Sequence, residues 1–164
     1  MVSNAAITPE IVWAALEDVQ DPEIPVVSVV DLGLIRDVRV HHGGVVVSMT
    51  PTFLGCPAIE VMQTEIVRCL RALGAAQVEV QLVLSPPWTS DWITDRGRAL
   101  LKTFGLAPPI RHNGLIQIIF SDAAACPHCG SSRTEQKNPF GATLCRALYY
   151  CRDCQQPFEQ FKAL

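Results

Sequence analysis

Two short cysteine pairs near the C-terminal end constrain the fold of this 164-residue chain more than any other feature. Cys126 and Cys129 form the first pair, Cys151 and Cys154 the second, and 21 residues separate the pairs. A tetrahedral Zn²⁺ ion takes four soft ligands, and each tight Cys-x-x-Cys turn supplies two of them. The spacing therefore predicts that a hairpin brings all four thiols to one metal ion.

The segment around these pairs is too small to fold on hydrophobic burial alone, and a bound metal ion can supply on the order of 10 kcal/mol. Its pattern resembles a zinc ribbon, with strands expected over residues 133–138, 144–150 and 158–162. Because four protein thiolates leave no open position for water, we expect one structural Zn²⁺ ion per chain.

Other interpretations of these cysteines stay open. The four thiols could carry no metal, or they could hold iron as in rubredoxin, since four thiolates also suit iron. His128 lies inside the first pair and is either a spare ligand or a surface residue. Cys145 lies outside both pairs, where a packed strand residue, a spare ligand and a redox thiol are all compatible with the sequence.

Hydrophobic periodicity before the cysteine pairs predicts an α+β fold. Helical spacing follows Thr8-Pro9 and recurs over residues 58–73 and 91–104, and strand-like segments cover residues 34–40, 45–49 and 77–84. This α-β-β-α-β-α order predicts helices packed on a small, mainly antiparallel sheet. The helix between the second and third strands allows one parallel pair.

The best candidate for a linker is residues 108–114, because this stretch combines prolines, a glycine and polar residues. We therefore expect an α+β domain over residues 1–107 and a zinc-ribbon domain over residues 115–164. A strand-like stretch at residues 115–120 would begin the second domain.

Charge and composition exclude several classes of partner. The net charge is −3, and neither residues 1–121 nor residues 122–164 are basic enough for a nucleic-acid interface. No apolar run approaches the length of a membrane span, and the first residues lack the basic start of a secretory signal. We therefore expect a cytoplasmic protein whose seven cysteines stay reduced.

A second candidate site is the stretch Thr50–Pro57, which lies between a strand and a helix. It places Cys56 at the expected helix cap, with Pro57 at the first helical position. Free N–H groups and the positive end of the helix dipole favour a thiolate there, and Gly55 would let the backbone approach closely. The alternative is a cysteine that only caps the helix.

The surroundings of Cys56 argue against a hydrolase. Asp21, Glu23 and Asp31 lie in turns that could reach the same face, but the sequence places no histidine as a base for the thiol. Cys69, by contrast, falls on the apolar stripe of its helix, and we expect it in the core.

Three motifs resemble those of the MIP18 (DUF59) family, which is linked to iron–sulfur cluster assembly. They are Asp21–Pro25, Asp31–Ile35 and Thr50–Pro57. With its added cysteine-rich tail, the whole chain is similar to the PaaD family of phenylacetate-degradation proteins.

The resemblance implies a non-catalytic accessory factor that helps to mature the multicomponent phenylacetyl-CoA epoxidase, a di-iron monooxygenase with an iron–sulfur reductase. Subunits of that complex would be its partners, and a homodimer is compatible with this role. By position, Cys56 would handle iron or an iron–sulfur cluster transiently, with Asp21, Asp31 and Thr50 near it, and the ribbon would be a docking surface. The alternatives are a zinc-ribbon module that binds protein or nucleic acid, and a thiol enzyme.

Overall fold

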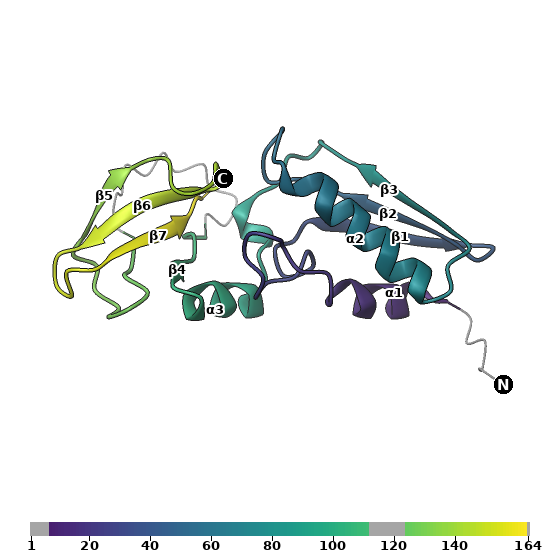
Figure 1. Cartoon of the computed structure of the whole chain (residues 1–164), viewed down its shortest axis with the longest axis horizontal. Helices are drawn as coiled ribbons and strands as arrows, with labels where there is room; N and C mark the ends of the chain where they lie inside the picture. The colour runs from purple at the N-terminus through teal and green to yellow at the C-terminus, as the bar shows by residue number, and fades with distance from the viewer. Residues whose placement is uncertain (1–6, 112–123, 164) are drawn as a thin grey trace. The chain divides into compact units, whose positions relative to one another are not determined.

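The computed structural model describes residues 7–111 and 124–163. Its contacts divide the chain into two compact units, Met1–Trp88 and Thr89–Leu164, and each unit has its own β-sheet (Figure 1). In the described part, no helix is long and apolar enough to cross a membrane.

The first unit is built on a three-stranded sheet in the order β1-β2-β3. Strand β1 (Ile35–His41) pairs antiparallel with β2 (Gly44–Met49) through a tight turn. Helix α2 (Ala58–Ala72) then carries the chain back, so β3 (Gln77–Leu82) pairs parallel with β2. The α+β class is confirmed, and the sheet contains one antiparallel and one parallel pair, as the crossover helix allows.

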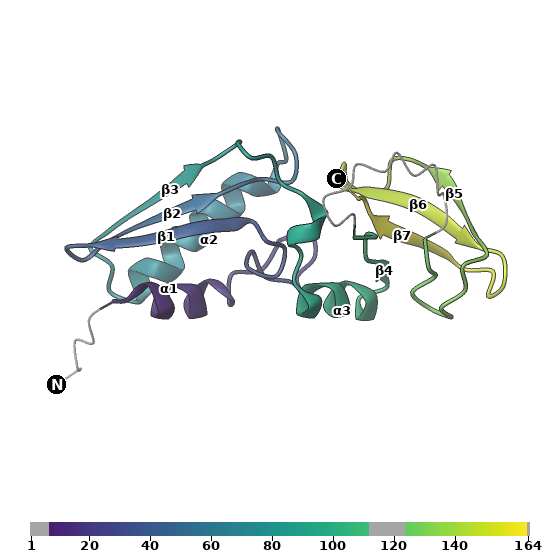
Figure 2. The same ribbon diagram turned by 180° about the vertical axis from the view of Figure 1, so that it is seen from behind.

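Helix α1 (Pro9–Leu16) begins as predicted, because the Thr8 side chain accepts a hydrogen bond from the Ile11 N–H at 3.4 Å. It contacts both α2 and β1. Figures 1 and 2 show α2 crossing one face of the sheet, whereas no helix among the described residues of this unit covers the opposite face.

The apolar stripe of α2 faces the sheet and explains why this helix forms. Its buried residues recur every three or four positions, namely Ala58, Ile59, Met62, Ile66 and Leu70. Glu60 in the first turn and Arg71 in the last turn suit the helix dipole.

Polar side chains tie the strands together on the open face of the sheet. Arg39 donates to the Gln81 Oε1 atom at 3.4 Å, and the Gln81 Nε2 atom donates to Glu79 Oε1 at 2.7 Å. This face is therefore polar and solvated, as is usual for one side of a small sheet.

The second unit begins with a 3₁₀ turn, η1 (Ser90–Trp92), and helix α3 (Asp95–Thr103). The prediction of a single helix over residues 91–104 is therefore wrong. The Thr94 side chain accepts from the Gly97 N–H at 2.9 Å and caps α3, and Ile93 is extended between the two helical segments.

The remaining strands of this unit form a four-stranded sheet in the order β4-β7-β6-β5. They are β4 (Leu106–Ala107), β5 (Thr134–Asn138), β6 (Arg146–Cys151) and β7 (Pro157–Phe161). The three strands expected for the ribbon correspond to β5, β6 and β7, and β4 pairs parallel with β7. Stacking of Tyr149 on Phe158, with ring centroids 5.6 Å apart, fills the centre of this sheet.

The pairing of β4 with β7 affects where the two units of the chain divide. The contacts divide the chain after Trp88, earlier than the boundary expected near residue 107, because β4 pairs with β7 and α3 packs against β4. Residues 112–114 of the expected linker and the strand expected over residues 115–120 lie outside the described residues.

Replacing Ile66 with Ala should lower the free energy of unfolding by about 2–5 kcal/mol, because Ile66 is fully buried between α2 and the sheet. Val61 on the same helix is 48% exposed, so Val61→Ala should change the free energy of unfolding by less than about 0.5 kcal/mol. Urea denaturation followed by circular dichroism measures both. Equal losses in the two variants would contradict this packing of α2.

Candidate functional site

The four thiols of the two cysteine pairs converge in the second unit. Their sulfur atoms all lie within 4.8 Å of one another. Cys126 Sγ is 3.7 Å from Cys154 Sγ, and Cys129 Sγ is 3.6 Å from Cys151 Sγ. Four sulfurs at Zn–S distances of about 2.3 Å in a tetrahedron lie about 3.8 Å apart, so the observed spacing fits one tetrahedral metal ion.

Backbone turns hold the two pairs of thiols in place. In the first pair, the Gly130 N–H donates to the Cys126 carbonyl and the Cys126 N–H donates to the Ser131 carbonyl, both at 2.9 Å. In the second, the Cys151 N–H donates to the Gln156 carbonyl at 3.0 Å. Each pair thus lies on a closed turn next to the sheet, and β6 supplies Cys151 directly.

A side-chain contact joins the two turns. Asp153 lies between the second pair of cysteines, and its carboxylate accepts from the Ser131 hydroxyl at 2.5 Å. Its other oxygen pairs with Arg133 Nη1 at 2.9 Å, and the Arg133 N–H donates to the Ser131 hydroxyl at 2.9 Å. These residues hold the turns together from outside the thiol cluster.

The thiols differ in how readily they ionise. N–H groups of Cys154 and Asp153 lower the pKa of the Cys151 thiol to about 7, whereas burial raises the pKa of Cys154 to about 12. Four thiolates so close together repel one another, so a cation is needed to hold all of them ionised.

His128 and Cys145 are not members of this cluster. His128 is exposed, and the Cys145 Sγ atom lies 3.0 Å from the Thr143 hydroxyl, one residue before β6. Cys145 is half-buried in the turn before β6, so it is not a residue of the strand itself.

The structure shifts the start of α2 by one residue relative to the prediction. Pro57 is the N-cap and the helix begins at Ala58, so Cys56 precedes the cap; the Ile59 N–H donates to the Cys56 carbonyl at 3.2 Å. Gly55 has φ +85°, and a Cβ atom built there would meet nothing within 4 Å. The loop thus needs glycine for its backbone conformation, not for close approach.

The expectation that helix N–H groups favour a Cys56 thiolate is corrected by the surroundings of the side chain. Burial raises the pKa of the half-buried thiol, and the negative charges of Glu23 and Asp21 raise it further. The N–H groups of Ala58 and Ile59 offset only part of this rise. Cys56 is therefore a protonated thiol at neutral pH in the absence of a bound cation.

The other residues expected near Cys56 have distinct places. Asp21 accepts from the N–H groups of Glu23 and Ile24 at 2.8 and 2.9 Å, which shapes the loop that faces the thiol. Asp31 is buried, and its Oδ2 atom accepts from the Ser28 hydroxyl at 2.9 Å. Thr50 is also buried, and its N–H donates to the Leu34 carbonyl at 2.8 Å.

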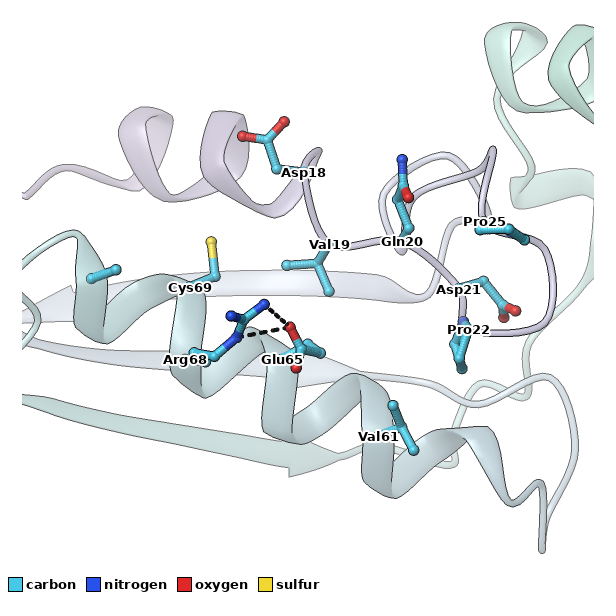
Figure 3. Close-up of a pocket in the computed structure, with 11 residues that line it drawn as sticks. Asp18, Val19, Gln20, Asp21, Pro22, Pro25, Val61, Glu65, Arg68 and Cys69 are labelled. Carbon is cyan, nitrogen blue, oxygen red and sulfur yellow. Dashed lines mark hydrogen bonds and ion pairs between the residues drawn. The ribbon is translucent and has the colours of Figure 1, made fainter.

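A groove of about 600 Å³ lies between the loop after α1 and one side of α2 (Figure 3). Asp18 and Asp21 line it from the loop, and Glu65, Arg68 and Cys69 line it from the helix. Cys69 is half-buried there, and its thiol lies 3.4 Å from the Ala15 carbonyl, so the expectation of a core residue is wrong. Cys69 lies at the edge of the apolar stripe, where helical spacing does not separate core from rim.

Comparison with known proteins places both units. The model of a family described as "Iron-sulfur cluster assembly protein" matches residues 9–82, and that of the "PaaD zinc beta ribbon domain" matches residues 120–162. An Escherichia coli (strain K12) protein, provisionally named as one of the subunits of a 1,2-phenylacetyl-CoA epoxidase, is 39% identical over 93% of this chain and 92% of its own.

Two further proteins match the first part of the chain. The Bacillus subtilis (strain 168) Fe-S protein maturation auxiliary factor YitW is 39% identical over 50% of this chain and 81% of its own. The crystal structure of a DUF59 domain from Bacillus anthracis, 30% identical, superposes with a TM-score of 0.53 over 56% of this chain and 89% of its own.

The chain thus combines a domain that matches the iron–sulfur cluster assembly family model with one that matches the PaaD zinc β-ribbon model. It belongs to the PaaD family, which confirms the resemblance of its sequence motifs.

Replacing Glu23 with Gln should lower the pKa of the Cys56 thiol, because it removes a negative charge that opposes the thiolate. Alkylation of Cys56 by iodoacetamide at pH 7 should become faster, as quantified by peptide mass spectrometry across a pH series. Asp37→Asn is the matched control, since Asp37 pairs with Arg39 on β1. An unchanged pH profile in Glu23→Gln would show that this carboxylate does not act on the thiol.

Proposed function

We propose that this protein is a non-catalytic accessory factor that handles iron or an iron–sulfur cluster while the phenylacetyl-CoA epoxidase is matured. One observation carries the proposal: the loop before α2 presents a single half-buried thiol, Cys56, beside the carboxylates of Asp21 and Glu23. A thiol and carboxylates are ligands that iron accepts. The partial exposure of Cys56 leaves it open to a partner.

The relatives support this role at two levels. Proteins named Fe-S protein maturation auxiliary factor match the unit that carries Cys56. The relative that matches nearly the whole chain is named as an epoxidase subunit. The finer proposal combines the two, with the oxygenase or the iron–sulfur reductase subunit of the epoxidase as the client. We also propose a cytoplasmic location for this protein, because its free thiols suit that reducing compartment.

Acid–base catalysis by a Cys/His pair has little support at this site. Among the residues that the structure describes, His41 and His42 lie at the β1–β2 turn and His128 in the ribbon. None of them is among the groups that affect the pKa of Cys56. A thiol with a raised pKa and no histidine partner in the described part of the chain is a poor nucleophile, and transient metal binding suits it better.

Replacing Cys56 with Ala in cells that depend on phenylacetate should leave the epoxidase short of iron and lower its activity severalfold. Cys69→Ala is the matched control, because Cys69 is also half-buried and lies on the same unit. Iron content and turnover of the epoxidase purified from each strain measure the effect. An epoxidase with full iron and full activity from the Cys56→Ala strain would overturn the thiol's role.

We also propose that Cys126, Cys129, Cys151 and Cys154 hold one structural zinc ion. Four thiols at tetrahedral spacing support this, because they fill the coordination shell and leave no position for water. When bound, the ion would supply folding energy to a small sheet whose core is completed by Cys126 and Cys151.

Cys126→Ser should abolish stoichiometric zinc and lower the melting temperature of the full chain. Cys145→Ser should retain the zinc, because Cys145 is outside the cluster. Elemental analysis of the purified proteins decides between the metals. Iron in place of zinc, with a visible thiolate-to-metal absorption band, would favour the rubredoxin-type alternative.

The nucleic-acid alternative is disfavoured by the ribbon's own charges. Arg133 pairs with Asp153 at 2.9 Å, and Lys137 and Arg152 both pair with Glu135. Pairing with these carboxylates reduces the net positive charge that the basic side chains offer to phosphates. The ribbon is therefore better suited to contacts with protein.

A further inference from the structure

The groove between the loop after α1 and one side of α2, named the α2 groove, is large enough to hold part of another molecule. Its volume of about 600 Å³ lies within the range of about 300–1,000 Å³ that is typical of binding sites. Figure 3 shows the loop on one side of it and α2 on the other. The apolar residues that line it are Val19, Pro22, Pro25, Val61 and Ala72. Val61 is 48% exposed, so part of this apolar lining is open to solvent in the free protein.

The side chains that α2 contributes to the groove form a ridge along the helix. They recur every three or four positions, namely Val61, Glu65, Arg68, Cys69 and Ala72. At 1.5 Å per residue this ridge is about 16 Å long, and a second helix can pack against a ridge of this kind. An extended peptide would find few main-chain partners there, because α2 uses its own N–H and C=O groups within the helix. The shape of the groove therefore favours a helical occupant.

Carboxylates give the α2 groove a net negative charge. Asp18, Asp21 and Glu65 line it, and Arg68 is the one basic residue among the described residues that line it. Arg68 Nε donates to Glu65 Oε2 at 2.9 Å, so Arg68 offsets the charge of Glu65. Neither Asp18 nor Asp21 forms an ion pair within the part of the chain that the structure describes. These two carboxylates therefore remain to attract basic side chains of a partner.

The charge of the whole first unit also favours a basic partner. Residues 1–88 contain ten Asp and Glu residues against four Arg and no Lys, which gives a net charge of −6. A field of this sign attracts basic segments and repels a second copy of the same unit. A contact of groove on groove would also place the Asp18 and Asp21 carboxylates of two copies near one another. The charges therefore favour a different protein as the occupant.

We propose that the α2 groove binds a basic amphipathic helix of a partner protein. Apolar side chains of that helix pack on Val61 and Ala72, and its arginine or lysine side chains pair with Asp18 and Asp21. This inference goes beyond the proposed function, because it rests on the shape and the charge of the groove and not on Cys56.

The groove is a neighbour of the candidate thiol and a separate site. Asp21 lines the groove, and its negative charge also acts on the Cys56 thiol. Cys56 itself is not among the residues that line the groove. A helix in the α2 groove is therefore held near Cys56, and its binding can be measured without any metal.

The first test uses two designed peptides as probes. Each is an alanine-based helix of about 15 residues with leucines along one face, long enough to be partly helical on its own. One peptide carries arginines beside the leucines, and the other carries glutamates at the same positions. Titration of the ¹⁵N-labelled full chain should give saturable shifts of the Asp18, Val61 and Cys69 amide signals with the arginine peptide only. No shift with the arginine peptide, or equal shifts with both peptides, would overturn the proposal.

The second test separates the groove from attraction by net charge. Asp18→Lys reverses a charge in the groove, and Asp37→Lys makes the same change in net charge on β1, where Asp37 pairs with Arg39 at 3.1 Å. Asp18→Lys should weaken binding of the arginine peptide at least tenfold, because like charges then face each other, whereas Asp37→Lys should weaken it less than twofold. Circular dichroism checks that both variants are folded. Equal losses in the two variants would show that the peptide responds to net charge alone and would overturn the groove as its site.

The third test examines the apolar contact and the independence from the thiol. Replacing the leucines of the arginine peptide with serines should weaken binding at least tenfold, because the contact with Val61 and Ala72 is lost. The Cys56→Ala chain should bind the arginine peptide as tightly as the wild type. Undiminished binding of the serine peptide would contradict an amphipathic occupant. Loss of binding in the Cys56→Ala chain would contradict a groove that is separate from the thiol, whatever iron the epoxidase contains.

Discussion

The packing of α2 on the sheet determines the position of Cys56. Ile66 and Leu70 are fully buried on the inner face of α2, and Met49 is fully buried at the end of β2. The loop between these elements is fixed at both ends, and Gly55 adopts the positive φ that directs the chain into the helix. The thiol is consequently displayed by a loop on a rigid scaffold.

Two kinds of thiol in one chain follow from two kinds of surroundings. In the ribbon, four sulfurs converge at metal-binding distance, and the turns beneath them are closed by backbone hydrogen bonds. Cys56 instead stands alone, half-buried and beside two carboxylates that oppose its ionisation. The first arrangement suits a resident ion. The second suits a metal ligand that is bound only transiently, because a bound cation must offset the free energy needed to deprotonate the thiol.

Periodicity and cysteine spacing predicted the elements and the metal cluster, because both signals are local in the sequence. The two-residue strand β4 was missed, since a strand so short has no alternation to detect. The cap at Thr94 was missed because the residues on both sides of it are compatible with one continuous helix. Cys56 was placed in the right loop, but its pKa was expected to move the other way. The acids that raise it are distant in sequence, and burial cannot be read from a single helix end.

If Cys56 handles iron while the ribbon keeps its own metal, the two sites must load independently. Native mass spectrometry after anaerobic addition of ferrous iron and sulfide tests this most directly. The wild-type chain is predicted to keep one zinc ion and gain iron, and the Cys56→Ala chain to keep its zinc and gain none. Equal iron uptake by both chains, or iron that displaces the zinc, would contradict the separation of the two roles.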